Sequence, residues 1–421
     1  MTESTFSGMS KITRLFGLLR RNRRILLARL RGALEAENML VLARHGADLC
    51  RHPRSRAPAT DLQHRECASR AVGWICRSQD VVGSGGVGCY DFSGWSAGYP
   101  EVTGYIIPTM WDYAKLLGRQ DLAQRAREMA DWELSLQQEC GGWEGSNEGD
   151  NVPPTVFNTG QVIRGLVRTY EGTGESRYLD AAARAAQWIV VTQQPDGSWS
   201  ASNYLGLQRV YDTYVAAPLA NLSLLTGEQR FAQAARDNCA FALRQQHANG
   251  WFALCDNSSF YNDAPLTHTI CYTADGLVEA GELLDEPSYI DAGARAAEAL
   301  ASRVYDSGYL PGRFDQHWNP KVPWSCLTGA AQLGVLLTRL HRRTGDPSLL
   351  ETASRLFAFL AHVQTLGAGT AHGDGGIPGS YPIWGSYAPF RYPCWATKYF
   401  LDLALALEPT FTPRDPASVA A

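Results

Sequence analysis

The stretch that decides the fold is residues 132–143, WELSLQQECGGW, which returns at residues 188–199 as WIVVTQQPDGSW. A looser copy at residues 241–251 reads FALRQQHANGW. The glutamine anchors of the copies, at positions 79, 137, 193, 245 and 364, lie 58, 56, 52 and 119 residues apart. The last gap holds two periods, with a degenerate copy near residues 302–309. The chain therefore contains six copies of a unit of roughly 50–60 residues, a length typical of a helix-pair repeat.

Each copy contains two helical patterns. The first is amphipathic and rich in Ala and Arg, and it predicts helices at residues 66–78, 120–138, 177–193, 228–246, 288–304 and 347–364. The second is apolar on most faces, which predicts buried helices at residues 101–117, 156–171, 210–225, 267–284, 326–343 and 392–407. Short glycine turns lead from the second pattern to the first, whereas long loops rich in Gly, Asn and aromatic residues lead from the first to the second.

These patterns predict an all-α fold, an (α/α)6 toroid in which six helical hairpins form an inner and an outer ring. We expect the toroid to be one domain, at residues 61–410. A basic amphipathic helical arm is expected at residues 1–60 and a disordered tail at residues 411–421. An open α-solenoid is the alternative, although it would need capped terminal repeats.

The motif Gln-x(3–5)-Gly-x-Trp at the end of an outer helix resembles the Gln-Trp repeat of terpenoid cyclases and protein prenyltransferases. The resemblance implies the six-hairpin toroid, which polysaccharide lyases, glucuronyl C5-epimerases and several glycoside hydrolases also adopt. We interpret Gln137, Trp143, Gln193, Trp199 and Trp251 as structural, because a glutamine can satisfy backbone groups at a helix end while a tryptophan packs over it.

Composition and charge exclude several classes of protein. The 421 residues are 45% hydrophobic, with 38 basic and 42 acidic side chains, which excludes intrinsic disorder. Ten cysteines form no CxxC pair, and basic residues interrupt the N-terminal apolar stretch, which excludes a secretory signal. We therefore expect a cytoplasmic protein with free thiols. No cofactor is expected, since GSGGVG at residues 83–88 lacks the preceding strand of a dinucleotide fold. No metal is expected either, because His268 and Cys271 could supply only two ligands.

The long loops of such a toroid emerge on one face and lead into the N-termini of the inner helices, at the mouth of the central cavity. The candidate acids and bases there are Glu101, Asp212, His268, Tyr105 and Tyr272. The candidate substrate contacts are Tyr99, Asn158, Gln161, Tyr211, Asp263, Arg313, Asp315, His317, Trp324, Trp384, Tyr387, Arg391, Trp395 and Lys398. Helix capping alone would explain Asn158, Asp212 and Asp263, but it does not explain the aromatic surplus of 12 Trp and 18 Tyr.

Aromatic side chains mixed with a few hydrogen-bonding groups are typical of a ligand cleft. This predicts a carbohydrate-active enzyme acting on an anionic, uronate-containing or lipid-linked glycan in polysaccharide biosynthesis or modification. Lyase, C5-epimerase and hydrolase chemistry stay open at this point. An isoprenoid enzyme is the alternative, but the chain has no DxDD motif, and the Asp-x-Cys at Asp237 to Cys239 lies inside a predicted outer helix. A non-catalytic glycan-binding toroid is the third hypothesis.

Residues 10–31 form a separate basic segment. They carry eight Lys and Arg residues and no acid, and their apolar residues fit one face of a helix. The pattern predicts peripheral contact with an anionic membrane at its inner face, and a helix that packs on the toroid is the alternative. Removing this +8 from the net charge of −4 leaves −12 on the rest of the chain, so no nucleic-acid partner is expected.

Overall fold

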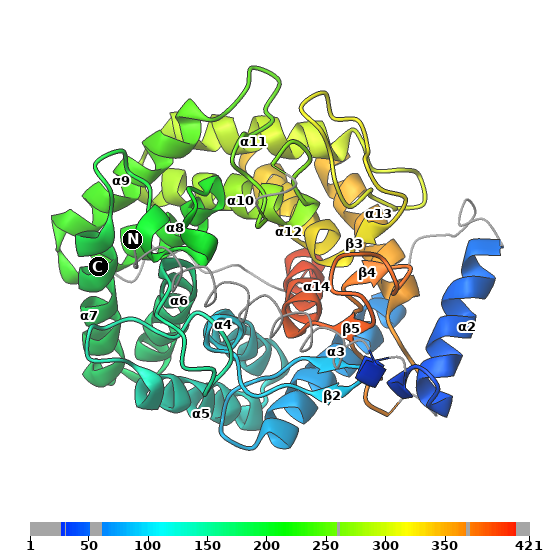
Figure 1. Ribbon diagram of the computed structural model, residues 1–421. Helices are drawn as coiled ribbons and strands as arrows, with labels where there is room; N and C mark the ends of the chain where they lie inside the picture. Colours follow the sequence, from blue (N-terminus) through cyan, green and yellow to red (C-terminus); the bar gives the residue numbers. More distant parts are fainter. Residues whose placement is uncertain (1–26, 30, 51–60, 259–261, 368–370, 410–421) are drawn as a thin grey trace, which may run out of the picture.

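The computed structural model describes residues 27–29, 31–50, 61–258, 262–367 and 371–409, and its helices form two concentric rings (Figure 1). The inner ring consists of α4 (Pro100–Leu117), α6 (Val156–Thr173), α8 (Thr213–Thr226), α10 (Thr267–Leu284), α12 (Leu327–Thr344) and α14 (Cys394–Leu407). The outer ring consists of α3 (Asp61–Val82), α5 (Gln120–Leu136), α7 (Ser176–Thr192), α9 (Gln229–Arg244), α11 (Pro287–Ala301) and α13 (Pro347–Val363). The predicted (α/α)6 toroid is confirmed.

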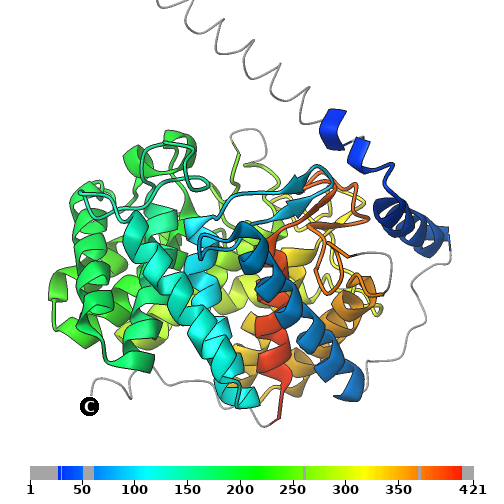
Figure 2. The same ribbon diagram turned by 90° about the horizontal axis from the view of Figure 1, so that it is seen from below.

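The two ends of the toroid differ, as Figure 2 shows. One end, called the loop face here, carries the long loops and the short strands, which are β1 (Tyr90–Asp91), β2 (Gly94–Trp95), β3 (Ser325–Cys326), β4 (Ser380–Tyr381) and β5 (Arg391–Tyr392). The other end, the turn face, carries the tight turns from each inner helix to the next outer helix. Glycines in the left-handed conformation end four of these inner helices, at Gly118, Gly174, Gly227 and Gly345. The N-termini of the inner helices therefore meet at the loop face.

The repeat glutamines join neighbouring outer helices. The Gln137 amide donates to the carbonyl of Gly141 in its own loop, at 3.0 Å, and to that of Ala181 on α7, at 2.9 Å. Gln79, Gln193 and Gln364 make the same pair of bonds in their copies. In the fourth copy the bonds come from Gln246, so the predicted anchor at Gln245 is wrong by one residue.

The repeat glycines are required by contact with the next outer helix. Gly197 has φ of 87°, and a Cβ there would lie 2.2 Å from the carbonyl oxygen of Asp237 on α9. Gly308 meets the Arg355 carbonyl of α13 in the same way, with 2.0 Å to a built Cβ. The degenerate fifth copy therefore contains the repeat glycine, Gly308. It has Val304 at the position of the repeat glutamine, four residues before that glycine.

The repeat tryptophans pack back onto their own outer helices. The indole N–H of Trp143 donates to the carbonyl of Glu133, and that of Trp199 donates to the carbonyl of Ile189, each at 2.9 Å. Both indoles are fully buried. The structural interpretation of the Gln-Trp motif is confirmed, so the motif itself gives no reason to expect isoprenoid chemistry.

The ring closes between the first and last repeats. Strand β1 pairs antiparallel with β5, with Tyr90 opposite Tyr392. The Gln364 amide donates to the carbonyl of Cys67 on α3, and Arg65 forms an ion pair with Glu408 at 3.1 Å. These contacts, which we call the seam, rule out the open solenoid.

Helix α2 (Ala36–Cys50) packs on the outside of the toroid beside the seam. Arg44 donates to the carbonyl of Gln364, and the backbone N–H of Ile383 donates to His45. Burial lowers the pKa of His45 to about 4. Most of the predicted arm, residues 1–26, 30 and 51–60, lies outside the described residues, as does all of the predicted tail. Within the described chain, no helix has the length and apolar character needed to cross a membrane.

Candidate active site

A cavity of about 610 Å³ opens on the loop face, within the range of roughly 300–1,000 Å³ that ligand pockets occupy. It lies over the N-termini of the inner helices. Nine of the predicted site residues line it: Tyr99, Glu101, Asn158, Tyr211, His268, Tyr272, Tyr387, Arg391 and Trp395.

Glu101 is the carboxyl group that the fold places in this cavity at the first turn of α4. Proline at the first position fixes the start of the helix, so the second residue projects at the mouth of the ring. The Tyr99 hydroxyl donates to the Glu101 carboxylate at 2.6 Å. Burial nevertheless raises the pKa of Glu101 to about 7, because the one hydrogen bond does not compensate for lost hydration. Glu101 can therefore both accept and donate a proton near neutral pH.

His268, in the first turn of α10, is the second titratable group of the cavity. Its Nδ1 lies 2.7 Å from the amide oxygen of Gln332 on α12. Because that oxygen only accepts, Nδ1 carries the proton and Nε2 keeps its lone pair. Burial lowers the pKa of His268 to about 4, so the ring is neutral at pH 7. The His268 ring is therefore a weak base, and its Nε2 is a hydrogen-bond acceptor with a fixed orientation.

Aromatic rings form one side of the cavity. The indole N–H of Trp395 donates to the Tyr387 hydroxyl at 2.8 Å, which fixes both rings. The Tyr387 and His268 rings are 5.7 Å apart, and Phe157 and Tyr272 are 5.0 Å apart. Rigid aromatic faces beside a few polar groups suit a ligand with both apolar and hydroxylated surfaces.

Oppositely charged groups lie at the rim of the cavity. Asp91 of β1 forms ion pairs with Arg391 of β5 at 3.4 Å and with Arg29 at 3.3 Å. Asp91 also accepts hydrogen bonds from Ser93, and these bonds with the two guanidinium groups outweigh burial and lower its pKa. One carboxylate thus faces two arginines, which leaves one positive charge for an anionic group of a ligand.

Asp212, predicted as a catalytic acid, does not line the cavity. It ends a short 3-10 turn, Val210–Asp212, before α8, and it is fully buried. One carboxylate oxygen accepts from the Asn203 amide at 2.7 Å, and burial raises the pKa of Asp212 well above its usual value. The 3-10 turn directs Asp212 under the loop, where it positions Asn203 at the cavity wall.

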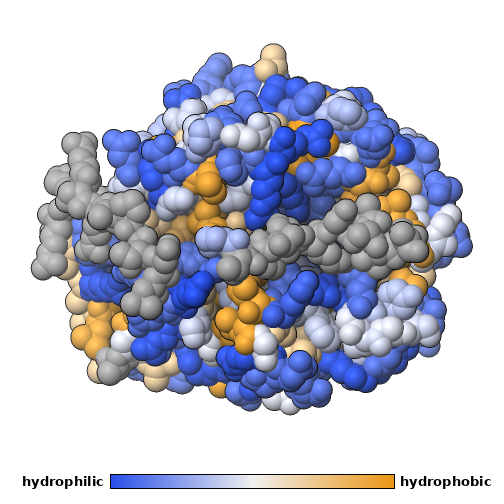
Figure 3. Space-filling model, turned by 180° about the vertical axis from the view of Figure 1, so that it is seen from behind, coloured by the Kyte–Doolittle hydropathy of each residue, from blue (hydrophilic) through white to orange (hydrophobic). Residues whose placement is uncertain are grey.

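Two further predicted residues, Tyr105 and Lys398, lie in a different cavity. This one, of about 590 Å³, opens on the turn face, and Figure 3 shows that the surface at this end is largely hydrophilic. Lys398 forms an ion pair with Asp402 at 2.6 Å, so its predicted contact with a substrate at the loop face is wrong. Both residues lie more than one helical turn beyond the start of their helices, below the level of Glu101.

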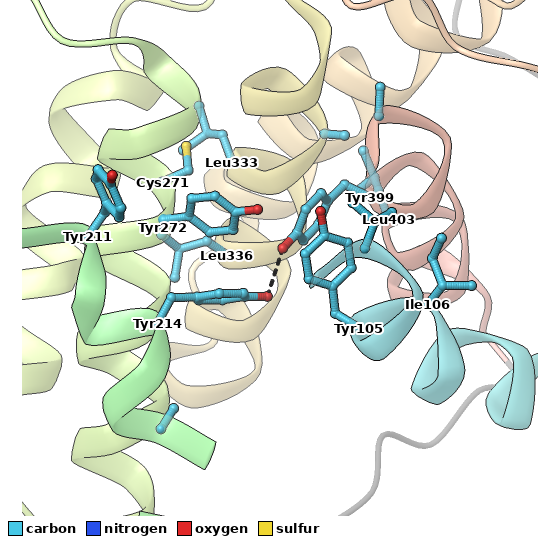
Figure 4. Packing of buried hydrophobic residues seen from close by; sticks show 14 of the residues in the cluster. Tyr105, Ile106, Tyr211, Tyr214, Cys271, Tyr272, Leu333, Leu336, Tyr399 and Leu403 are labelled. Atoms are coloured by element: carbon cyan, nitrogen blue, oxygen red, sulfur yellow. Dashed lines mark hydrogen bonds between the residues drawn. The ribbon is translucent and has the colours of Figure 1, made fainter. Parts of the chain in front are cut away.

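Tyr105, Tyr214 and Tyr399 line the turn-face cavity, and Tyr272 lines the loop-face cavity. These four side chains lie together, as Figure 4 shows, and we call them the tyrosine layer. The Tyr399 hydroxyl donates to the Tyr214 hydroxyl at 3.0 Å, and the Tyr214 and Tyr272 rings are 4.6 Å apart. Charged groups of the turn-face cavity pair with one another, as in Arg164 with Glu279 at 2.7 Å. The poised carboxyl group is on the other side of the layer, so the loop-face cavity is the candidate active site.

Three residues predicted to contact the substrate, Gln161, Arg313 and Asp315, instead form hydrogen bonds or ion pairs within the fold. Gln161 accepts from Arg164, which faces the turn-face cavity. Arg313 forms a buried ion pair with Asp256 at 2.7 Å. Asp315 accepts from the backbone N–H groups of the turn that follows it.

The remaining four predicted contacts also lie away from the cavity lining. Asp263 and His317 are exposed on surface loops. Trp324 is buried in a small cluster with Leu266 and Cys326. Trp384 lies beside His45 of α2, with ring centroids 6.3 Å apart. Each belongs to a long loop, as predicted, but the loops direct these side chains outward or into packing.

Sequence reasoning missed several polar residues of the cavity wall. Asp91, Asn147, Asn203 and Asn257 all lie in strands, turns or loops without helical periodicity. Their only signal is the Asn- and Gly-rich composition of the long loops.

No protein family and no curated protein matches the sequence. Solved structures do match the fold. An unsaturated glucuronyl hydrolase from Bacillus sp. GL1 is 14% identical with a TM-score of 0.67, over 83% of this chain and 97% of that one. Cellobiose 2-epimerase from Bacillus thermoamylovorans B4167 is 12% identical with a TM-score of 0.65, over 82% and 98%. A sugar epimerase from a ruminal bacterium is 12% identical with a TM-score of 0.64, over 82% and 98%. At these identities the likeness establishes that the chain shares the (α/α)6 toroid of these enzymes.

Proposed function

We propose that this chain is a carbohydrate-active enzyme in which Glu101 is the general acid–base group. The observation that carries the proposal is a carboxyl group with its pKa raised to about 7 in an aromatic-lined cavity. An acid–base group is most effective when its pKa lies near the working pH. Names of proteins with the same fold, glucuronyl hydrolase and sugar epimerase, support a saccharide as the substrate class.

The walls of the cavity fit a saccharide. Trp395 and Tyr387 present ring faces for the apolar face of a sugar, while Asn158 and the free Nε2 of His268 can bond to its hydroxyl groups. Arg391 at the rim suits an anionic group on the same glycan. A purely apolar prenyl chain would leave these polar groups desolvated and unpaired, which disfavours the isoprenoid alternative.

The reaction that the site favours is a proton transfer centred on one carboxyl group. Hydrolysis of a glycosidic bond by the usual route needs two carboxyl groups that flank the bond. Among the described residues of the cavity wall, the carboxyl groups are Glu101 and Asp91, and Asp91 is held by two arginines. We therefore favour an epimerisation or an elimination, in which Glu101 removes or returns a proton, over two-carboxylate hydrolysis.

The N-terminal arm is proposed to hold the enzyme at an anionic membrane surface. The outward face of α2 is apolar along its length, with Ala36, Met39, Leu40, Ala43 and Ala47 exposed. Residues 10–31 precede it with eight basic residues and no acid. Apolar contact combined with basic charge is the pattern of peripheral membrane binding. A lipid-linked glycan at the membrane would then be within reach.

The test is product analysis on a panel of neutral and uronate-containing disaccharides. A change of configuration, a new double bond or released monosaccharides would distinguish epimerase, lyase and hydrolase. Glu101→Gln should lower turnover by about 10²–10⁴-fold, the usual contribution of a general acid–base group. Glu351→Gln, an exposed change on α13, is the matched control and should have no effect. Turnover that survives Glu101→Gln would reject the assignment.

A further inference from the structure

Two thiols meet at the seam of the ring. The Sγ atoms of Cys89 and Cys394 are 3.2 Å apart, although the residues are 305 positions apart in the sequence. Cys89 directly precedes β1, and Cys394 is the first residue of α14. The pair therefore lies just beyond the β1–β5 pairing that joins the first and last repeats.

The surroundings make the two thiols unequal. Cys89 accepts hydrogen bonds from the thiol and the backbone N–H of Cys394, and it lies near Arg391, all of which lower the pKa of Cys89 against the effect of burial. Burial and the neighbouring Cys89 raise the pKa of Cys394. Cys89 thus faces the N-terminus of α14 and a guanidinium group, and both are surroundings that favour a reactive thiolate. By contrast, burial raises the pKa of Cys255 and of Cys326 to about 12, which leaves those thiols inert.

Small reagents can reach Cys89 but not Cys394 directly. Cys89 lines the loop-face cavity, whereas Cys394 is fully buried behind it. The cavity thus leads from solvent to Cys89 and not to Cys394. The order of any oxidation is fixed by this access, with Cys89 reacting first and Cys394 second.

We propose that Cys89 and Cys394 form a redox-active dithiol that a peroxide converts into a disulfide across the seam. In the first step the Cys89 thiolate attacks the peroxide O–O bond, which gives a sulfenic acid at Cys89 and releases hydroxide when the oxidant is hydrogen peroxide. In the second step the Cys394 sulfur attacks the sulfenic sulfur, the S–S bond forms and the oxygen leaves as water. Two thiols and one hydrogen peroxide thereby become one disulfide and two waters. A small dithiol reductant reverses the reaction by thiol–disulfide exchange.

The disulfide would link the first loop of the toroid to its last helix. The sulfur atoms need to approach by only about 1.1 Å to reach a bond length of about 2.05 Å. A link across 305 residues restricts the unfolded chain strongly, so the oxidised protein should melt about 5 °C above the reduced one. Trp395 follows Cys394 directly, so the same bond fixes one aromatic wall of the candidate active site.

The experiment uses the full chain with Cys140→Ser, which removes an exposed thiol. The protein is treated with graded hydrogen peroxide, its free thiols are alkylated under denaturing conditions, and its peptides are analysed by mass spectrometry. We expect one dominant disulfide, joining the peptides that contain Cys89 and Cys394, together with the rise in melting temperature. Recovery of both cysteines as alkylated thiols, at a dose that oxidises Cys140 in the unchanged chain, would overturn the proposal.

Two single variants test the predicted order of reaction. In Cys394→Ser, peroxide should leave a sulfenic acid on Cys89, which dimedone traps. In Cys89→Ser, Cys394 should remain a thiol at the same dose. Equal trapping on the two cysteines would refute the order, and the direct analysis of the Cys140→Ser protein stays decisive even if either variant folds poorly.

Discussion

Replacing Glu101 by Gln should stabilise the protein, by an amount that grows as the pH rises from about 4.5 to about 7. Folding moves the pKa of this carboxyl group from 4.5 to about 7, so the folded protein binds the proton more tightly than the unfolded chain does. The stabilisation from protonation is complete below about pH 4.5 and is lost as the pH rises through about 7. The shift corresponds to about 3 kcal/mol. Gln resembles the protonated acid at every pH and keeps the acceptor for Tyr99.

The assay is denaturant-induced unfolding of the unchanged protein and of Glu101→Gln between pH 5 and pH 8. We expect the free energy of unfolding of the variant to exceed that of the unchanged protein by about 1 kcal/mol at about pH 5 and by about 3 kcal/mol at about pH 8. Other titrating groups, His268 among them, occur in both proteins and cancel in the difference. Tyr99→Phe is the second variant, and its loss of a hydrogen bond should raise the pKa of Glu101 further. A difference between the proteins that does not change with pH would refute the reasoning and, with it, the acid–base role.

Three further predictions concern other parts of the molecule. Gly308→Ala should lower the free energy of unfolding by more than about 2 kcal/mol, because the added Cβ would meet the Arg355 carbonyl. Gly345→Ala has a similar φ but open space around the added Cβ, and it should lower the free energy of unfolding by about 1 kcal/mol. Thermal melting of the two variants compares these effects. Arg313→Ala removes the ion-pair partner of the fully buried Asp256, so it should lower the free energy of unfolding by about 3–5 kcal/mol in a denaturant titration. A decrease below about 1 kcal/mol would contradict a stabilising role of this buried ion pair. Deletion of residues 1–26 should abolish sedimentation with anionic liposomes and leave the melting temperature unchanged, and undiminished sedimentation would reject membrane contact through this segment.

Much of the fold could be predicted because each repeat obeys the same local rules. Helical periodicity separates the inner from the outer ring, and glycine turns indicate which ends are tight. Two glutamines are adjacent at residues 245–246, and only the contact with the Ala292 carbonyl selects Gln246 over the predicted Gln245. The fifth copy has a weak sequence pattern because Val304 occupies the position of the glutamine.

The candidate site was less predictable, for two physical reasons. A position at a helix start does not fix the direction of a side chain, so Glu101 faces the cavity whereas Asp212, after a 3-10 turn, is buried beneath a loop. The distance of a residue from the start of its helix also matters. Lys398 lies four residues beyond the start of α14, which is about 6 Å along the helix axis. It therefore lines the turn-face cavity, on the far side of the tyrosine layer. The rim residues depend on loop conformations that carry no periodic signal.

The proposed function depends above all on the loop-face cavity binding a saccharide with Glu101 at the reacting position. The most direct measurement is a crystal structure of Glu101→Gln soaked with the disaccharides of the panel. We predict a sugar ring against Trp395 and Tyr387, with the amide that replaces the Glu101 carboxyl group within hydrogen-bond distance of a ring or linkage atom. A saccharide bound in the turn-face cavity, or a loop-face cavity that stays without saccharide at concentrations that support turnover, would contradict the assignment.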